Sequence, residues 1–272
     1  MTVDLHTHTT VSDGECSPAD LVAAAAEVGL SVIAVTDHDA VAAIPLARAA
    51  APPGLEVLVG VELTCQVGGR EAHILAYGFD LEEPNFSAAL ARFASDREER
   101  AAGIVGRLKD LGLAIEMSDV EAESETGTIA RPHVAMALVR CGHAASVDEA
   151  FQRYLGRQRP AFVAKPALDP GVAFDLVRAA GGVSVLAHPG TFRRDDLIPI
   201  LVEAGLDGLE ARHTEHSAAN TRHYEQMAAS LGLLVTGGSD FHGTPGHHGR
   251  LGRPTVPYAW YEALFARIQQ RR

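Results

Sequence analysis

Apolar residues gather in short runs along the chain, and stretches with a helical period separate most of these runs. The apolar runs predict seven β-strands. They cover residues 3–8, 31–39, 55–67, 70–79, 183–189, 207–213 and 234–242. Because helical patterns follow most of them, the chain is typical of parallel βα units.

The predicted helices carry recognisable end signals. Residues 17–30 have Ser17 placed as a cap, Pro18 in the first turn and Gly29 at the end. The pair Gly68-Gly69 instead predicts a turn that joins the third and fourth strands as a hairpin. Further helical patterns cover residues 40–51, 169–182, 195–205, 217–232 and 258–272.

The alternation stops between residues 84 and 165, where helical stretches at 85–113, 131–142 and 146–156 follow one another without a strand pattern. We therefore predict a helical insertion over 84–165. It separates a first barrel part, residues 1–83, from a second part, residues 166–272. The strand pattern favours an α/β fold with a seven-stranded barrel, one unit short of the usual eight; a doubly wound open sheet is the alternative.

Composition adds limits on location and partners. Hydrophobic residues make up 47% of the 272 residues, which suffices for a core without disulfides. The three cysteines are widely spaced, and no apolar run forms a signal peptide or a membrane span, so we expect a cytoplasmic protein. The net charge of −12 argues against duplex DNA as a partner, unless bound metal ions supply local positive charge.

Titratable residues fall at or near the ends of the predicted strands. The carboxyl ends of barrel strands share one face, where active sites form, and residues at spacing i, i+2 point to the same side of a strand. Burying so many such groups without metal would cost roughly several kcal/mol each, so the pattern predicts a metal cluster. The candidate ligands are His6, His8, Asp13, His38, Glu62, His73, His188, Asp240 and His242.

Nine ligands indicate two or three divalent ions that share a carboxylate, for which Glu62 is the natural bridge. Imidazole and carboxylate donors without thiolate suit manganese, iron or zinc, with manganese slightly preferred. Paired ions lower the pKa of a bridging water, and the resulting hydroxide can attack phosphorus without a protein nucleophile.

The stretches DLHTHTTVSDG, TDHD, GVE, AHI, AHP and GGSDFH occur in this order from the start to the end of the chain. As a set they resemble the PHP family, named for polymerase and histidinol phosphatase domains. The resemblance implies a distorted seven-stranded (β/α) barrel with a trinuclear metal site. It also implies one ion held by His6, His8, Glu62 and Asp240, a second by Glu62, His73 and His188, and a third by Asp13, His38 and His242.

Within this family the sequence is most similar to stand-alone phosphoesterases that act on nucleotides, including nucleoside 3′,5′-bisphosphate phosphatases and a 5′-to-3′ exoribonuclease. The stretch from Ser12 to Pro18, the helical insertion and its ARPHVA stretch carry this similarity. It implies hydrolysis of terminal phosphate esters in nucleoside bisphosphates, mononucleotides or short RNA 5′ ends. Ala40 departs from the Thr or Ser that often follows TDHD, but it is not a ligand position.

Other residues are candidates for substrate contact and proton transfer. Arg131 and His133 open a helix of the insertion, where they can grip a phosphate; a surface arginine and a capping-region histidine are the alternative. Lys165 is a further phosphate contact or a solvated charge. His213 ends the sixth strand outside the ligand set, so we predict that it donates a proton to the leaving oxygen; a purely structural histidine is the alternative. Asp240 and Glu62 are the other predicted catalytic residues.

The remaining candidates are read as structural. His143, His216 and His223 are expected at the surface, His247 and His248 in a solvated loop, Cys16 and Cys65 in packing, and Glu210 is unassigned. Two other functions compete: a phosphatase for histidinol phosphate, and a non-catalytic PHP-like module. A module of the second kind should have lost ligands, and this chain keeps all of them.

Overall fold

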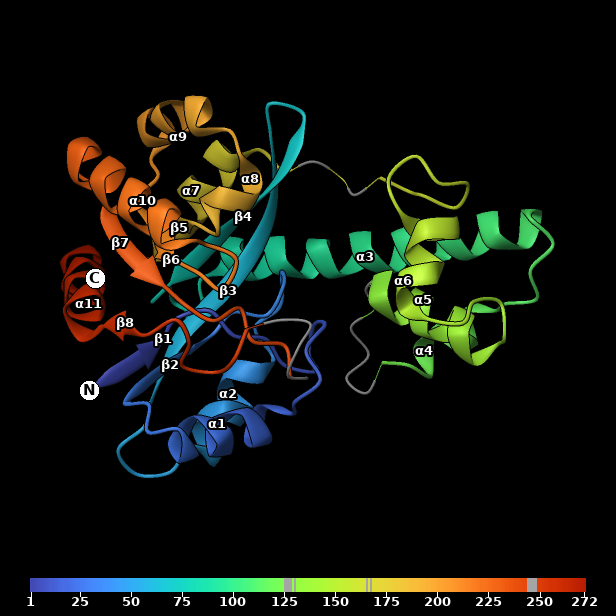
Figure 1. Cartoon of the computed structure of the whole chain (residues 1–272), viewed down its shortest axis with the longest axis horizontal. Coiled ribbons are helices and arrows are strands. Elements are labelled where there is room, and N and C mark those ends of the chain that lie inside the picture. The colour runs from blue at the N-terminus through green and yellow to red at the C-terminus, as the bar shows by residue number, and fades with distance from the viewer. Residues whose placement is uncertain (125–128, 130, 165, 167, 244–248) are drawn as a thin grey trace.

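The computed structural model describes residues 1–124, 129, 131–164, 166, 168–243 and 249–272. A barrel-like sheet surrounded by helices forms the larger part of the molecule. A helical lobe extends from it along the long helix α3 (Pro84–Asp110) and contains α4 (Met117–Glu121), α5 (Arg131–Arg140) and α6 (Val147–Ala150) (Figure 1). Both chain ends lie on the barrel, far from the lobe.

The described residues form eight strands in one sheet, in the order β7-β6-β5-β4-β3-β2-β1-β8. The prediction of seven strands is therefore wrong by one, because the two-residue strand β8 is too short to show an alternating pattern. It pairs antiparallel with β1. The strands are β1 (Thr2–Asp4), β2 (Val32–Val35), β3 (Glu56–Val67), β4 (Arg70–Tyr77), β5 (Val183–Leu186), β6 (Gly208–Arg212), β7 (Leu234–Gly237) and β8 (Val256–Pro257).

The sheet nearly closes because the chain after β7 runs beside the chain after β1. The N–H of Asp240 donates to the carbonyl of His6, and the N–H of His8 donates to the carbonyl of Phe241, both at 2.9 Å. Thr7 and Phe241 form a parallel bridge between the same segments. The fold is thus the predicted α/β barrel-like arrangement rather than an open, doubly wound sheet.

Strand β4 runs antiparallel to both β3 and β5, whereas β1–β2–β3 and β5–β6–β7 are parallel. The hairpin turn at Gly68 and Gly69 has φ of 55° and 77°, which glycine adopts readily, and it confirms the predicted hairpin. In its register His73 lies opposite Thr64. His73 therefore shares a face of the sheet with Glu62, one diagonal step away.

Helices cover the barrel and build the lobe. Ser17 caps α1 as expected, since its side chain accepts the N–H of Asp20. Helices α4 and α8 were not predicted, because five and four residues are too few for a helical period. The helices are α1 (Pro18–Glu27), α2 (Ala43–Ala50), α3 (Pro84–Asp110), α4 (Met117–Glu121), α5 (Arg131–Arg140), α6 (Val147–Ala150), η1 (Phe151–Leu155), α7 (Pro170–Ala179), α8 (Pro189–Phe192), η2 (Asp195–Leu197), α9 (Ile198–Ala204), α10 (Ala218–Leu231) and α11 (Tyr258–Arg271).

Barrel and lobe have separate apolar cores. Inside the barrel, Tyr77 on β4 donates to the carbonyl of Leu5 at 2.7 Å, although β3 and β2 lie between them in the sheet. Residues of α11, such as Leu264, pack into this interior cluster. The lobe has its own cluster, which includes Ile104 of α3 and Leu138 of α5. None of the helices in the described ranges has the length and apolar character that a membrane span requires.

Candidate metal centre and active site

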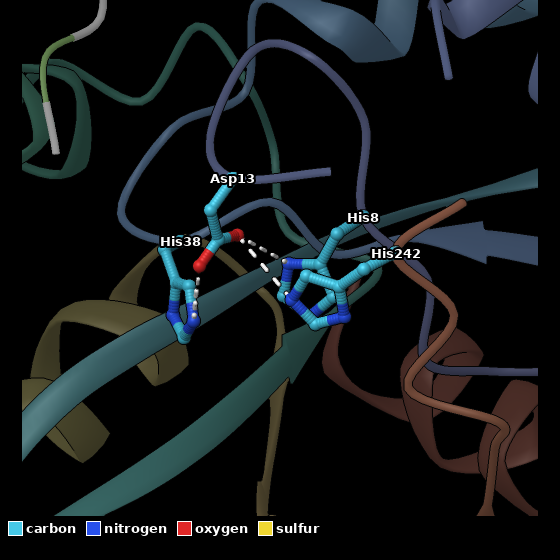
Figure 2. Close-up of side chains that lie close together, drawn as sticks. All are labelled: His8, Asp13, His38 and His242. Atoms are coloured by element: carbon cyan, nitrogen blue, oxygen red, sulfur yellow. Dashed lines mark ion pairs between the residues drawn. The ribbon is translucent and has the colours of Figure 1, made fainter. Parts of the chain in front are cut away.

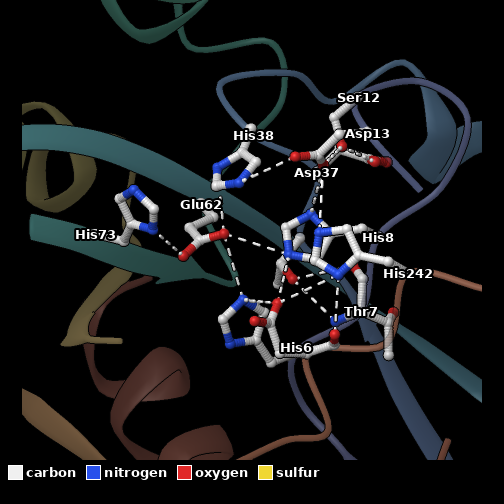
Figure 3. A network of polar contacts seen from close by, with 12 residues as sticks. His6, Thr7, His8, Ser12, Asp13, Asp37, His38, Glu62, His73 and His242 are labelled. Atoms are coloured by element: carbon white, nitrogen blue, oxygen red, sulfur yellow. Dashed lines mark hydrogen bonds and ion pairs between the residues drawn. The ribbon is translucent and has the colours of Figure 1, made fainter. Parts of the chain in front are cut away.

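All nine predicted ligand residues come together at one rim of the barrel, although they come from segments spread over the whole chain. Figure 3 labels all of them except His188 and Asp240. Glu62 lies at the centre and is 1% exposed. Its two carboxylate oxygens lie within 3.3 Å of nitrogens from five imidazoles, those of His6, His8, His38, His73 and His188.

One group of four donors has the spacing of ligands around a single ion. The Nε2 atoms of His6 and His8 both lie 3.3 Å from Oε2 of Glu62. The same nitrogens lie 3.3 Å and 3.1 Å from Oδ1 of Asp240. Donors that surround one ion at about 2.1 Å are roughly 3.0–3.4 Å from one another, so this group fits one divalent cation.

The other oxygen of Glu62 belongs to a second group. Oε1 lies 2.9 Å from Nδ1 of His73 and 3.2 Å from Nε2 of His188. A different ring, that of His38, places its Nδ1 3.2 Å from Oε2 of the same carboxylate. Glu62 can therefore serve two cation positions at once.

A third group surrounds Asp13, in the loop after β1 (Figure 2). Its Oδ1 lies 3.4 Å from Nε2 of His242 and 3.6 Å from Nδ1 of His8, and its Oδ2 lies 3.6 Å from Nε2 of His38. These distances exceed those in the first group, so the third position is the more open one.

Several ring nitrogens of this cluster are buried and have no hydrogen-bond partner among the described residues: Nε2 of His6, both nitrogens of His8 and Nδ1 of His38. Burying such a group without a partner costs about 1–3 kcal/mol, so nitrogens of this kind are suited to hold a cation.

Opposite ring nitrogens are fixed by acceptors. Nδ1 of His6 lies 3.0 Å from Oε1 of Glu210, and Nδ1 of His242 lies 2.9 Å from the carbonyl of Asp240. A carboxylate or a carbonyl only accepts hydrogen bonds, so the proton of each neutral ring is on Nδ1. The Nε2 lone pair of each ring is thereby left for the cluster.

Charge and burial act against each other in the metal-free cluster. Burial disfavours the charged form of His8, but the carboxylates of Asp240 and Glu62 outweigh it and raise the pKa to about 10. Glu62 likewise raises the pKa of His73 to about 10, against burial. At His38 burial dominates and lowers the pKa to about 4. The cluster thus combines protonated and neutral rings at neutral pH.

Two residues of the cluster have backbone conformations that side chains seldom adopt. His188 has φ of 28° and Asp240 has φ of 54°. The N–H of His188 donates to Oε2 of Glu210 at 2.8 Å, which holds this backbone in place. Strained residues that the surroundings hold in this way are typical of functional sites.

Buried carboxylates beneath the cluster were missed or left unassigned from sequence. Glu210 on β6 is fully buried, and Asp37 accepts hydrogen bonds from the N–H of Thr9 at 2.8 Å and the hydroxyl of Ser12 at 2.6 Å. A charged residue between apolar neighbours, as in LEA at 209–211, is the sequence signal that marks Glu210.

His213 lies beside the cluster and is oriented differently from the ligand candidates. Its Nδ1 accepts the N–H of Glu215 at 3.2 Å, so the proton of the neutral ring is on Nε2. That nitrogen lies 3.3 Å from Oδ2 of Asp240. The ring therefore presents a proton rather than a lone pair to the cluster.

A cavity of about 190 Å³ lies between the cluster and the helical lobe. Asp13, His38 and His73 line it on the barrel side, and Arg97, Arg100 and Arg131 line it on the other. Nη1 of Arg97 is buried, and no described residue forms a hydrogen bond with it. Burial and the charges of Arg131 and Arg97 lower the pKa of Arg100 to about 10. The cavity thus adds positive charge next to the candidate metal cluster.

Other sequence candidates lie elsewhere. His133 is 6% exposed and is not among the residues that line the cavity. His216 is half-buried rather than at the surface: its Nε2 accepts the N–H of Gly190 at 3.0 Å. No disulfide joins the three cysteines, all of which the structure describes. Lys165, His247 and His248 lie outside the described residues.

Known proteins are similar in sequence to this chain over most of its length. The model of the PHP domain family matches residues 4–162. A 5′-3′ exoribonuclease of Haemophilus influenzae is 34% identical over 246 residues, which cover 88% of this chain and 89% of the relative. A 3′,5′-nucleoside bisphosphate phosphatase of Chromobacterium violaceum is 32% identical over 258 residues, which cover 91% of this chain and 89% of the relative.

Among solved structures, a predicted metal-dependent phosphoesterase from Bifidobacterium adolescentis is 33% identical and superposes with a TM-score of 0.88. The superposition covers 97% of this chain and 96% of that one. The similarity therefore includes the helical lobe as well as the barrel.

Proposed function

The chain belongs to the PHP domain family, and from this membership and the site geometry we propose that it is a metal-dependent phosphoesterase acting on nucleotides. Its substrates are nucleoside 3′,5′-bisphosphates, mononucleotides or the 5′ ends of short RNA, from which it removes terminal phosphate. The observation that carries the proposal is the set of buried imidazole nitrogens that face carboxylate oxygens at one barrel rim and have no hydrogen-bond partner in the part of the chain that the structure describes.

Two or three divalent ions fit this rim, with manganese slightly preferred over iron or zinc. His6, His8, Glu62 and Asp240 would hold one, Glu62, His73 and His188 a second, and Asp13, His38 and His242 a third. When bound, such ions supply Lewis acidity: they offset the negative charge of a phosphate ester and make water a better nucleophile.

The chain's own residues supply the remaining chemistry. His213 holds a proton on Nε2 beside Asp240 and donates it to the leaving oxygen. Arg131 of the predicted insertion, residues 84–165, lines the cavity and would grip a phosphate that is not cleaved. Contact of His133 and Lys165 with that phosphate stays a prediction, because His133 is not part of the cavity lining and Lys165 lies outside the described residues. Arg97 and Arg100 support the role of Arg131, since they bring positive charge to the same cavity.

The negative net charge of this protein favours small substrates over long polyanions. The net charge of −12 repels long polyanions, so the proposal excludes duplex DNA. A cytoplasmic location is part of the proposal, and it is supported by the absence of a disulfide among the three cysteines.

A phosphate-release assay over a substrate panel tests the proposal. The panel contains nucleoside 3′,5′-bisphosphates, mononucleotides, 5′-phosphorylated short RNA and histidinol phosphate, each with Mn²⁺ added. We expect release from at least one nucleotide class. Release from histidinol phosphate alone would reverse the assignment in favour of the competing phosphatase.

The substitution Asp240→Asn tests whether the cluster is responsible. It removes one negative charge from the first group of donors with little change of shape, so hydrolysis should fall by at least about 100-fold. Asp196→Asn is the matched control, because Asp196 is exposed and pairs only with Arg194 among the contacts described. Full activity in Asp240→Asn would contradict the role of the cluster.

A further inference from the structure

Glu210 is a fully buried carboxylate that belongs to none of the three proposed ion sets. It lies on β6, and both of its oxygens contact residues of the cluster. Oε1 lies 3.0 Å from Nδ1 of His6, and Oε2 accepts the backbone N–H of His188 at 2.8 Å. An ionised carboxylate at 0% exposure is costly unless such contacts compensate it.

The two contacts act on different properties of the ligands. At His6 the carboxylate fixes the proton on Nδ1, so Nε2 faces the cluster as a lone pair. At His188 it fixes the backbone, whose φ of 28° is costly for a side chain of this size. The ring of His188 is oriented separately, since its Nδ1 lies 2.8 Å from the hydroxyl of Thr191.

His6 and His188 belong to different proposed ion sets. From this geometry we infer that Glu210 is a positioning residue that prepares two cation positions at once. This inference rests on the proposed function, because it assumes that both histidines hold divalent ions. It assigns a role to a charge that the hydrolytic chemistry itself does not use.

The substitution Glu210→Gln separates the two contacts. An amide has a single acceptor oxygen, so it can accept from His6 or from the His188 backbone, but not with two separate oxygens as the carboxylate does. If its NH₂ group faces His6, the ring proton moves to Nε2 and blocks the lone pair. In either orientation one ligand loses its support, and the loss of charge weakens both.

The experiment measures Mn²⁺ bound to purified protein over a titration with a competing chelator, with elemental analysis of the retained equivalents. We expect Glu210→Gln to weaken at least two Mn²⁺ equivalents by about 10–100-fold, the usual effect of losing a carboxylate behind a metal ligand. His188→Ala should weaken a single equivalent. These comparisons require no activity measurement.

Asp207→Asn is the matched control. Asp207 immediately precedes β6, is 7% exposed, and accepts the N–H of Ser184 at 2.9 Å and a hydrogen bond from Arg271. Its loss should lower the unfolding temperature and leave Mn²⁺ affinity unchanged. If Glu210→Gln does not fold, Glu210→Asp is judged by the same Mn²⁺ criterion.

The outcomes separate the inference from the function on which it rests. A folded Glu210→Gln protein that binds every Mn²⁺ equivalent as tightly as wild type, or that weakens only one, overturns the inference and leaves the proposed function standing. A wild-type protein that binds no Mn²⁺ contradicts the proposed function instead.

Discussion

At the residue scale, hydrogen bonds to the far side of each imidazole distinguish ligand candidates from a proton donor. His6 and His213 are both buried and both lie next to Asp240. An acceptor on Nδ1 of His6 leaves its Nε2 as a lone pair, whereas a donor to Nδ1 of His213 leaves a proton on its Nε2. Two residues of the same type thus have opposite roles in the proposed site.

Replacing His213 by Ala should therefore lower kcat by about 100-fold to 10,000-fold, the usual contribution of a general acid, and leave Mn²⁺ content unchanged. Steady-state kinetics and elemental analysis of the same preparation check both parts. His223→Ala is the control, since His223 is exposed and its Nε2 contacts Asp195 at 2.7 Å. Wild-type kcat in the His213 variant would end this assignment.

At the element scale, the closure of the sheet between the segments after β1 and β7 places four ligand candidates together. Gly238 lies where these segments approach most closely: a Cβ added there would lie 2.3 Å from Cβ of His6 and 2.5 Å from its backbone nitrogen. Neither atom is the end of a flexible side chain, so a larger residue at this position must separate the two segments.

We expect Gly238→Ala to lower the free energy of unfolding by roughly 1–3 kcal/mol and to weaken Mn²⁺ binding at the His6 position. Thermal unfolding and a chelator titration measure the two effects. The contrasting control is Gly106→Ala in α3, where an added Cβ meets nothing within 4 Å. That change should stabilise the helix by about 0.5–1 kcal/mol. Equal stability losses in the two variants would contradict this account of barrel closure.

At the scale of the whole molecule, the barrel and the lobe contribute different residues to the proposed active site. The barrel brings imidazoles and carboxylates to one rim, and the lobe adds Arg100 and Arg131 across the cavity. Arg97 connects the two parts, because its guanidinium pairs with Asp39 at 2.8 Å beside the metal cluster. Positive charge for a substrate phosphate is thus local, although the protein as a whole is acidic.

Metal binding by the whole cluster should release protons. Without metal the neighbouring carboxylates outweigh burial and hold the pKa of His8 and of His73 at about 10, so both rings are protonated at neutral pH. A cation must displace these protons, and its apparent affinity should therefore rise with pH between roughly 6 and 8. Calorimetric titration with Mn²⁺ in two buffers of different ionisation enthalpy measures the release. Identical heats in both buffers would show that the rings are already neutral.

The sequence by itself determined the features that depend on neighbouring residues. The alternation of strands and helices, the Gly68-Gly69 hairpin and the Ser17 cap follow from local periodicity and turn chemistry, and the structure confirms them. His6 and His8 were predicted on one strand, but β1 ends at Asp4 and both residues lie beyond it, on either side of the bridge residue Thr7; the structure nevertheless places both rings in one cluster. That these residues hold metal stays a prediction.

Only the tertiary structure decided what depends on distances between remote segments. Glu210 contacts His6, which is 204 positions away in the chain, so no local pattern reveals its place beneath the cluster. The two-residue strand β8 forms because β1 offers it an unpaired edge. The proton positions on His6 and His213, and the approach of Arg97 to the cluster, likewise depend on contacts that exist only once the barrel has closed.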